Sequence, residues 1–145
     1  MPAPRRRTKA IGRSIAIREK ALGPDHTDVG IGLHNLANLY RDQGKGDDAE
    51  PLYQRSLSIF ERAFGPEHPY VAYSFRERAN LYRDQGRHGD AEKLYERALD
   101  IFEKSVGPDH LNVAETLEQY AQLLRKIGRA GEADRLVKRA DSIRD

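Results

Sequence analysis

Gly23-Pro24-Asp25-His26 returns as Gly65-Pro66-Glu67-His68 and again as Gly107-Pro108-Asp109-His110, each copy 42 residues after the one before. A fixed period of this length is typical of a repeat array, in which each unit buries its apolar face against the next. The two segments that begin with the first two copies are identical at about 22 of their 42 positions, far above chance for unrelated segments. The sequence therefore predicts a repeat protein.

The repeats set the predicted domain organisation. Upstream of the first copy, Arg13-Ser14-Ile15-Ala16-Ile17 aligns with Arg55-Ser56-Leu57-Ser58-Ile59, so the array opens with the second half of a repeat. We expect a disordered basic tail over 1–8 and one domain over 9–145, made of a half repeat at 9–22 and repeats at 23–64, 65–106 and 107–144.

Each repeat is predicted to contain two helices. In the first helix of repeat one, apolar residues recur at helical spacing, and Gly44 is placed to end that helix. In the first helix the apolar positions are Val29, Leu33, Leu36, Ala37 and Tyr40. In the second helix they are Ala49, Leu52, Tyr53, Leu57, Ile59 and Phe60, and the small residue Ser56 stands among them. No strand pattern is present, so the fold class is all-α with about seven helices.

Composition and charge exclude several classes of function. The chain has no cysteine, which fits the reducing cytoplasm and excludes disulfides, and it has no run of 18 apolar residues that could span a membrane. The net charge is +2, and Arg5–Arg7 with Lys9 supply four positive charges, so the remainder sums to about −2. A nucleic-acid surface is not expected from this balance; RNA binding through Arg5–Arg7 is the remote alternative.

The repeat frame resembles the tetratricopeptide repeat, and its 42-residue form is similar to the kinesin light chain subclass. The residues that carry the resemblance are Leu33, Leu36, Ala37, Tyr40, Gly44, Ala49 and Tyr53, together with the string Leu39-Tyr40-Arg41-Asp42-Gln43-Gly44-Lys45. The resemblance covers residues 11–144. It implies a right-handed superhelical solenoid of antiparallel helix pairs, whose first helices line a concave groove that binds a peptide or a partner segment.

The resemblance also implies which residues face that groove. They are His34, Asn38 and Arg41 in repeat one, Arg76, Asn80 and Arg83 in repeat two, and Glu118, Gln122 and Arg125 in repeat three. We call these nine residues the polar stripe. The amides could pair with the backbone of a ligand, and the arginines could bind carboxylates or phosphates, which favours an acidic partner. The alternative is that the arginines pair locally with Asp42 and Asp84.

The half repeat suggests a second, structural function. Ile11, Ile15 and Ile17 predict a partly exposed apolar stripe through which the chain could form a homo-oligomer. Whether this helix caps the array or marks a truncated or divergent start is left open by the sequence.

No pattern in the sequence indicates catalysis. His26, His68 and His110 lie one per repeat, so we interpret them as turn or helix-capping residues instead of metal ligands. No phosphate-binding glycine loop or activated nucleophile is present. We therefore expect no catalytic residue, no cofactor and no metal. Arg78 replaces Leu36 in the core frame, and we expect it to point outward or to pair with a carboxylate.

Overall fold

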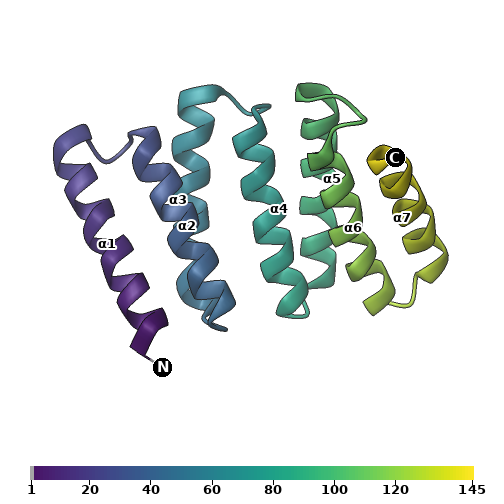
Figure 1. The fold of residues 1–145 in the computed structure, drawn as a ribbon, viewed down its shortest axis with the longest axis horizontal. Coiled ribbons are helices and arrows are strands. Elements are labelled where there is room, and N and C mark those ends of the chain that lie inside the picture. Colours follow the sequence, from purple (N-terminus) through teal and green to yellow (C-terminus); the bar gives the residue numbers. More distant parts are fainter. Residues whose placement is uncertain (1) are drawn as a thin grey trace. The chain divides into compact units, whose positions relative to one another are not determined.

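Seven helices form the described part of the chain (Figure 1). The computed structural model describes the backbone of residues 2–145 and the side chains of residues 6–145. The chain divides into two compact units, Met1–Pro66 and Glu67–Asp145, and the boundary lies inside the second copy of the repeated turn. The first unit contains α1 (Pro2–Leu22), α2 (Thr27–Asp42) and α3 (Gly46–Phe64); the second contains α4 (Pro69–Asp84), α5 (His88–Ser105), α6 (Leu111–Lys126) and α7 (Ala130–Arg144). The all-α fold is confirmed.

The repeated turn ends one helix and begins the next. Gly65 adopts a positive φ of 87°, which glycine reaches without steric cost, and the following proline cannot continue a helix. The histidine of each copy is the N-cap of the next helix. Nδ1 of His68 accepts a hydrogen bond of 3.1 Å from the backbone N–H of Tyr70, and His26 and His110 make the same bond. The capping role predicted for the three histidines is confirmed.

The helices pack as antiparallel pairs, α2 with α3, α4 with α5 and α6 with α7. The predicted apolar stripe of the first helix is buried at Val29, Leu33, Leu36 and Ala37, while Tyr40 is half-buried. In the second helix Leu52 and Leu57 are half-buried, and the other predicted core positions are buried. Burying these apolar surfaces is the main force that holds each pair together.

Two glycines let α2 approach both of its neighbours in the first unit. A Cβ added at Gly30 would lie 2.9 Å from Cε1 of Phe60 on α3. A Cβ added at Gly32 would lie 2.8 Å from Cγ1 of Ile15 on α1. Both distances are shorter than carbon atoms tolerate, so close helix approach explains why glycine stands in the middle of this helix.

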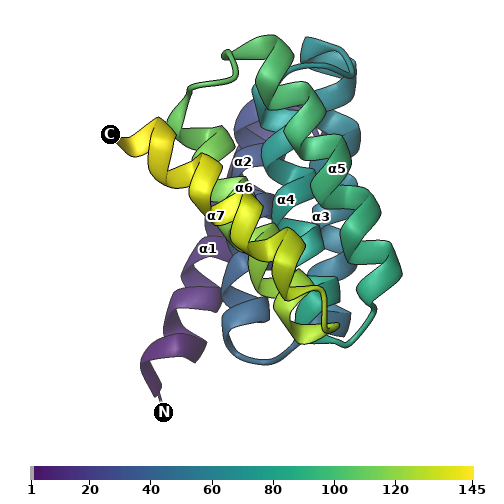
Figure 2. The ribbon, with the colours of Figure 1, turned by 90° about the vertical axis from the view of Figure 1, so that its right-hand side faces the viewer.

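Polar contacts as well as apolar ones join the second unit. The Tyr95 and Tyr120 rings stack with their centroids 5.4 Å apart. The Tyr120 hydroxyl donates to Oε2 of Glu92 at 2.5 Å, and Arg129 donates to the same carboxylate at 2.7 Å. In Figure 2 the last helix, α7, faces the viewer with α6 behind it. The outer face of α7 exposes charged side chains such as Arg135.

The N-terminal helix is longer than predicted. α1 begins at Pro2, so residues 2–8 form its first turns instead of the disordered tail that was predicted. Met1 lies outside the described residues. Proline is well tolerated in a first helical turn, where its missing N–H has no partner to lose. Among the described residues, no helix is long and apolar enough to cross a membrane.

Candidate functional site

The polar stripe lies on three helices that occupy equivalent places in the repeats. His34, Asn38 and Arg41 are on α2 of the first unit, and the other six residues are on α4 and α6 of the second. Each trio has the spacing i, i+4, i+7, which places its side chains on one face of a helix. The three trios differ strongly in how many contacts they make with the rest of the protein.

On α2 the trio is partly engaged by the second helix of its own repeat. His34 is buried, and its ring meets the Tyr53 ring edge-on at 5.4 Å between centroids. The Tyr53 hydroxyl donates a hydrogen bond to Oδ1 of Asn38. Arg41 retains 18% side-chain exposure, and its Nη2 lies 3.6 Å from a carboxylate oxygen of Asp42. The local ion pair considered from the sequence is therefore present.

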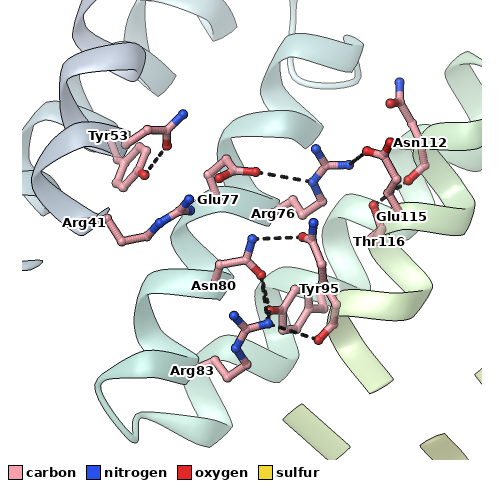
Figure 3. A network of polar contacts seen from close by, with 12 residues as sticks. Arg41, Tyr53, Arg76, Glu77, Asn80, Arg83, Tyr95, Asn112, Glu115 and Thr116 are labelled. Atoms are coloured by element: carbon pink, nitrogen blue, oxygen red, sulfur yellow. Dashed lines mark hydrogen bonds and ion pairs between the residues drawn. The ribbon is translucent and has the colours of Figure 1, made fainter. Parts of the chain in front are cut away.

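On α4 the first member of the trio is buried. Arg76 has 3% side-chain exposure, and its guanidinium lies 4.5 Å from the Tyr73 ring centroid and 5.8 Å from that of Phe102. Its Nε lies 3.5 Å from Oε1 of Glu77, and its Nη1 lies 3.4 Å from Oε2 of Glu115 on α6. These contacts hold the charge in place between two helices (Figure 3).

The other two members on α4 belong to one hydrogen-bonded network with α5 and α6. The Asn80 amide donates to Oε1 of Gln119 at 2.9 Å, and its oxygen accepts a hydrogen bond from the Tyr95 hydroxyl. Arg83 donates to the Tyr95 hydroxyl at 3.2 Å and to the Gln119 carbonyl at 3.4 Å (Figure 3). Burial raises the pKa of Tyr95 above its usual range. Both polar ends of the Asn80 amide are thus engaged inside the protein.

On α6 the trio is more open to solvent. Gln122 and Arg125 are exposed, and Arg125 lies 3.5 Å from Asp134 in an ion pair with more than half of each side chain exposed. Glu118 accepts two hydrogen bonds from Arg144 on α7, at 2.8 and 3.1 Å. The same three positions therefore form a locked network on α4 and an accessible surface on α6.

Sequence reasoning missed the tyrosines that anchor the stripe. Tyr53 is a predicted core position, and both it and its equivalent in repeat two, Tyr95, are fully buried, but each hydroxyl also binds the stripe amide 15 residues before it. The sequence contains a signal for this pair. In repeat three both positions change together, to Gln122 and Val137, and the bond is lost with them.

Of the three isoleucines predicted to form a partly exposed stripe on α1, one is buried and two keep some exposure. Ile15 is 5% exposed and packs against α2 at Gly32. Ile11 is half-buried, and Ile17 is 68% exposed. A helix turns by 100° per residue, so positions 15 and 17 face well apart and only one of them meets α2.

Arg78 and the three capping histidines can now be placed. Arg78 is half-buried and donates a hydrogen bond of 3.0 Å to the Tyr82 hydroxyl, with its guanidinium 5.7 Å from that ring's centroid. The three capping histidines lie in separate turns. No group of three or more His, Cys, Asp or Glu side chains within the described part of the chain could hold a metal ion.

The paired helices and the recurring turn can be compared with known protein families. A family model described as the tetratricopeptide repeat matches residues 28–104 and 71–144. The chain belongs to the tetratricopeptide repeat family. Repeats of this family are generally protein-interaction modules and are typically non-catalytic. This family assignment confirms the resemblance that the sequence indicated.

Solved structures show the same fold. BtubC from P. vanneervenii aligns with a TM-score of 0.88 and 22% identity, over 99% of this chain and 57% of that one. A kinesin light chain protein with TPR-like repeats from Podosopora anserina aligns with a TM-score of 0.76 and 23% identity, over 97% of this chain and 67% of that one. The tetratricopeptide repeats of this chain are thus structurally close to those of kinesin light chain-like proteins.

The similarity to curated proteins is local. Nephrocystin-3 from Mus musculus is 51% identical over 43 residues, about the length of one repeat. The match spans 30% of this chain and 3% of that protein. It therefore concerns the repeat itself and not the remainder of nephrocystin-3.

Proposed function

We propose that the chain is a non-catalytic scaffold that binds an extended acidic peptide or partner segment through the polar stripe on its first helices. The observation that carries this proposal is the recurrence of an amide and an arginine, three residues apart, on α2, α4 and α6. Amide and guanidinium groups suit a peptide backbone and its carboxylates. Since the chain has no cysteine, we place this activity in the reducing cytoplasm.

The exposure of the arginines supports this function. Arg41, Arg83 and Arg125 keep side-chain exposures of 18%, 14% and 51%, so none of the three side chains is fully buried. An arginine that neighbours already hold in one orientation loses little side-chain entropy when it binds a ligand. The network around Arg83 therefore preorganises one cation for an incoming carboxylate.

A peptide selection with charge-reversal variants tests this proposal. A displayed random-peptide library is selected on the immobilised chain, and the affinities of enriched peptides are measured by fluorescence anisotropy. We expect enrichment of Asp and Glu, and binding weakened at least about tenfold by R41E combined with R125E. Arg83 is left intact because it contributes to the folded network.

The matched control is K93E combined with R135E, which makes the same charge change at exposed positions on second helices. We expect this variant to bind like the unmodified chain, and thermal melts establish that both variants are folded. Equal loss of binding in the two variants would contradict the proposal, because a loss that follows net charge alone does not locate the site on the stripe.

A further inference from the structure

α1 corresponds to the second helix of a repeat, and the face that a first helix of the same repeat would cover is exposed. It packs along α2 in the first unit, as α5 packs along α6 in the second. α3 and α5 are also covered by the first helix of their own repeat, α2 and α4 respectively. Among the described residues of the first unit, no helix covers α1 in that way.

Equivalent positions show how much of α1 is uncovered. Ile59 on α3 and Ile101 on α5 are 2% and 7% exposed, whereas Ile17, at the same repeat position on α1, is 68% exposed. Tyr53 and Tyr95 are fully buried, but their equivalent, Ile11, is only half-buried. Since a helix covers these positions on α3 and α5, a helix is the element that fits them on α1.

An excess of positive charge is concentrated on the same helix, α1. α1 carries seven of the 25 Lys and Arg residues but only one of the 23 Asp and Glu residues. The rest of the chain holds 18 basic and 22 acidic residues, so it is net negative. The only acidic residue of α1, Glu19, is already paired with Arg55 of α3 at 2.9 Å. The positive charge of α1 is therefore left without a counterpart on the helix.

A row of cations borders the open face. Arg6, Arg13 and Lys20 recur every seven residues, which places them along one side of α1, and all three are exposed. No described residue forms an ion pair with any of these three. The equivalents of Lys20 on the covered helices do find partners: Arg62 lies 3.6 Å from Asp25, and Lys104 lies 3.1 Å from Asp100 on its own helix. The row therefore offers positive charge to whatever covers Ile17.

We propose that the open face of α1, formed by Ile11, Ser14 and Ile17, binds an acidic amphipathic helix of a partner protein. The apolar contact places the helix, and Asp or Glu side chains on it face the row of Arg6, Arg13 and Lys20. This site is separate from the polar stripe, which lies on first helices. Whether a partner helix binds to α1 is therefore independent of whether a peptide binds to the polar stripe.

The three first helices of the chain indicate what such a partner helix presents. Each buries the pattern Val-Gly/Ala-x-x-Leu/Phe-x-x-x-Ala: at positions 29–37 on α2, 71–79 on α4 and 113–121 on α6. Small residues at the second and last positions allow close approach to a second helix. The predicted partner combines this pattern with acidic flanks.

Self-association through α1 is disfavoured by the same charges. Two copies that faced each other at Ile17 would bring two rows of cations together, which costs free energy at moderate ionic strength. A surface-lying membrane helix also combines apolar and basic residues. The covered faces of α3 and α5 favour a helix as the occupant, because the same repeat positions bind a helix there.

The probe is a 16-residue peptide with the sequence of α6 that carries R125E and K126E, labelled for fluorescence anisotropy. It keeps the buried pattern and has four acidic residues. Its matched control keeps Arg125 and Lys126 and carries E115K and E118K, which reverses the charge at constant length. Short helices are only marginally stable in water, so a rise in helical circular dichroism on mixing reports docking independently of anisotropy.

We expect saturable binding of the acidic peptide, a gain of helicity, and binding about tenfold weaker for the charge-reversed peptide. I17E in the full chain should weaken binding at least about tenfold, because it places a carboxylate in the apolar contact. L111E, at another exposed apolar position, should change binding less than about twofold.

Two results would overturn the inference. The first is no saturable binding of the acidic peptide. If anionic phosphatidylserine vesicles then retain the chain and I17E abolishes this retention, α1 is assigned to a membrane surface instead. The second is equal binding of the peptide by I17E and the unmodified chain.

Discussion

α2 and α4 stand at the same place in consecutive repeats and both bury an apolar face, yet the further contacts that fix them to their neighbours differ. α2 contacts α1 and α3 through close packing at Gly32 and Gly30. α4 has Ala72 and Ser74 at those positions and is joined to α6 through Arg76 and Asn80. One repeat frame therefore tolerates two solutions, close backbone approach in the first unit and a polar network in the second.

The largest expected effect is on the polar network. R76A removes the charge that faces Glu77, which is only 6% exposed, and leaves that carboxylate buried without its guanidinium. Breaking a buried ion pair from one side costs about 3 kcal/mol, so the free energy of unfolding should fall by that amount in urea titrations. R125A, at an exposed site on α6, should change stability by less than about 0.5 kcal/mol. Equal effects of the two variants would mean that α4 and α6 do not differ as described.

The next effect concerns the close packing of α2. Alanine in place of a mid-helix glycine usually stabilises by about 1 kcal/mol. At Gly30 the new Cβ would meet Phe60 and Ile59, which are buried and cannot move away, so we expect G30A to destabilise by about 1 kcal/mol net.

G12A is the control for G30A, which we expect to destabilise the chain although Gly-to-Ala substitutions in helices usually stabilise. A Cβ at Gly12, in the middle of α1, meets nothing within 4 Å, so this substitution should stabilise or be neutral. Thermal melts of the two variants compare them directly. A stabilising G30A would show that α2 does not need close approach.

A third test compares the tyrosine–amide bond with the repeat that lacks it. Y95F removes the hydroxyl that donates a hydrogen bond to Asn80 and accepts one from Arg83. This substitution should lower the free energy of unfolding by about 1 kcal/mol. A double-mutant cycle of Y95F with N80A should give a coupling energy of at least about 0.5 kcal/mol. Q122A, at the equivalent exposed amide on α6, should be neutral; a cost equal to that of N80A would remove the distinction between the two helices.

The smallest effect is a dependence of stability on alkaline pH. Burial raises the pKa of Tyr95, and burial together with the Glu92 carboxylate raises the pKa of Tyr120. A phenol with a raised pKa in the folded state stabilises the fold fully below its unfolded pKa, and this contribution is lost as pH rises above it. At pH 10 each tyrosine should cost about 0.4 kcal/mol relative to pH 8, since ionisation then favours the unfolded chain. In Y95F the free energy of unfolding should fall less between pH 8 and pH 10 than in the unmodified chain. An equal fall in the two proteins would contradict the role assigned to Tyr95.

Much of the fold follows from the sequence because the repeat copies its local signals. The turn Gly65-Pro66-Glu67-His68 contains a residue that tolerates positive φ, a helix breaker and a capping acceptor, and each acts within a few residues of its neighbours. The helical spacing of Val29, Leu33 and Ala37 likewise fixes which face is buried. These features depend on local geometry, so they could be predicted.

The contacts of the polar stripe could not be predicted in the same way. Asn80 meets Gln119 across 39 residues, and whether an amide faces solvent or a neighbouring helix depends on how closely the helices approach. The same holds for Ile15, whose burial depends on a glycine 17 residues away. The repeat pattern gives these residues their positions on a helix but not their partners.

The most direct test of the proposed function is to map the bound peptide by NMR. Backbone amide shifts of the labelled chain are followed during titration with an acidic peptide selected from the library. We predict that the largest changes lie in α2, α4 and α6 around Arg41, Arg83 and Arg125. Changes confined to α1 or to the second helices α3, α5 and α7 would contradict binding through the polar stripe.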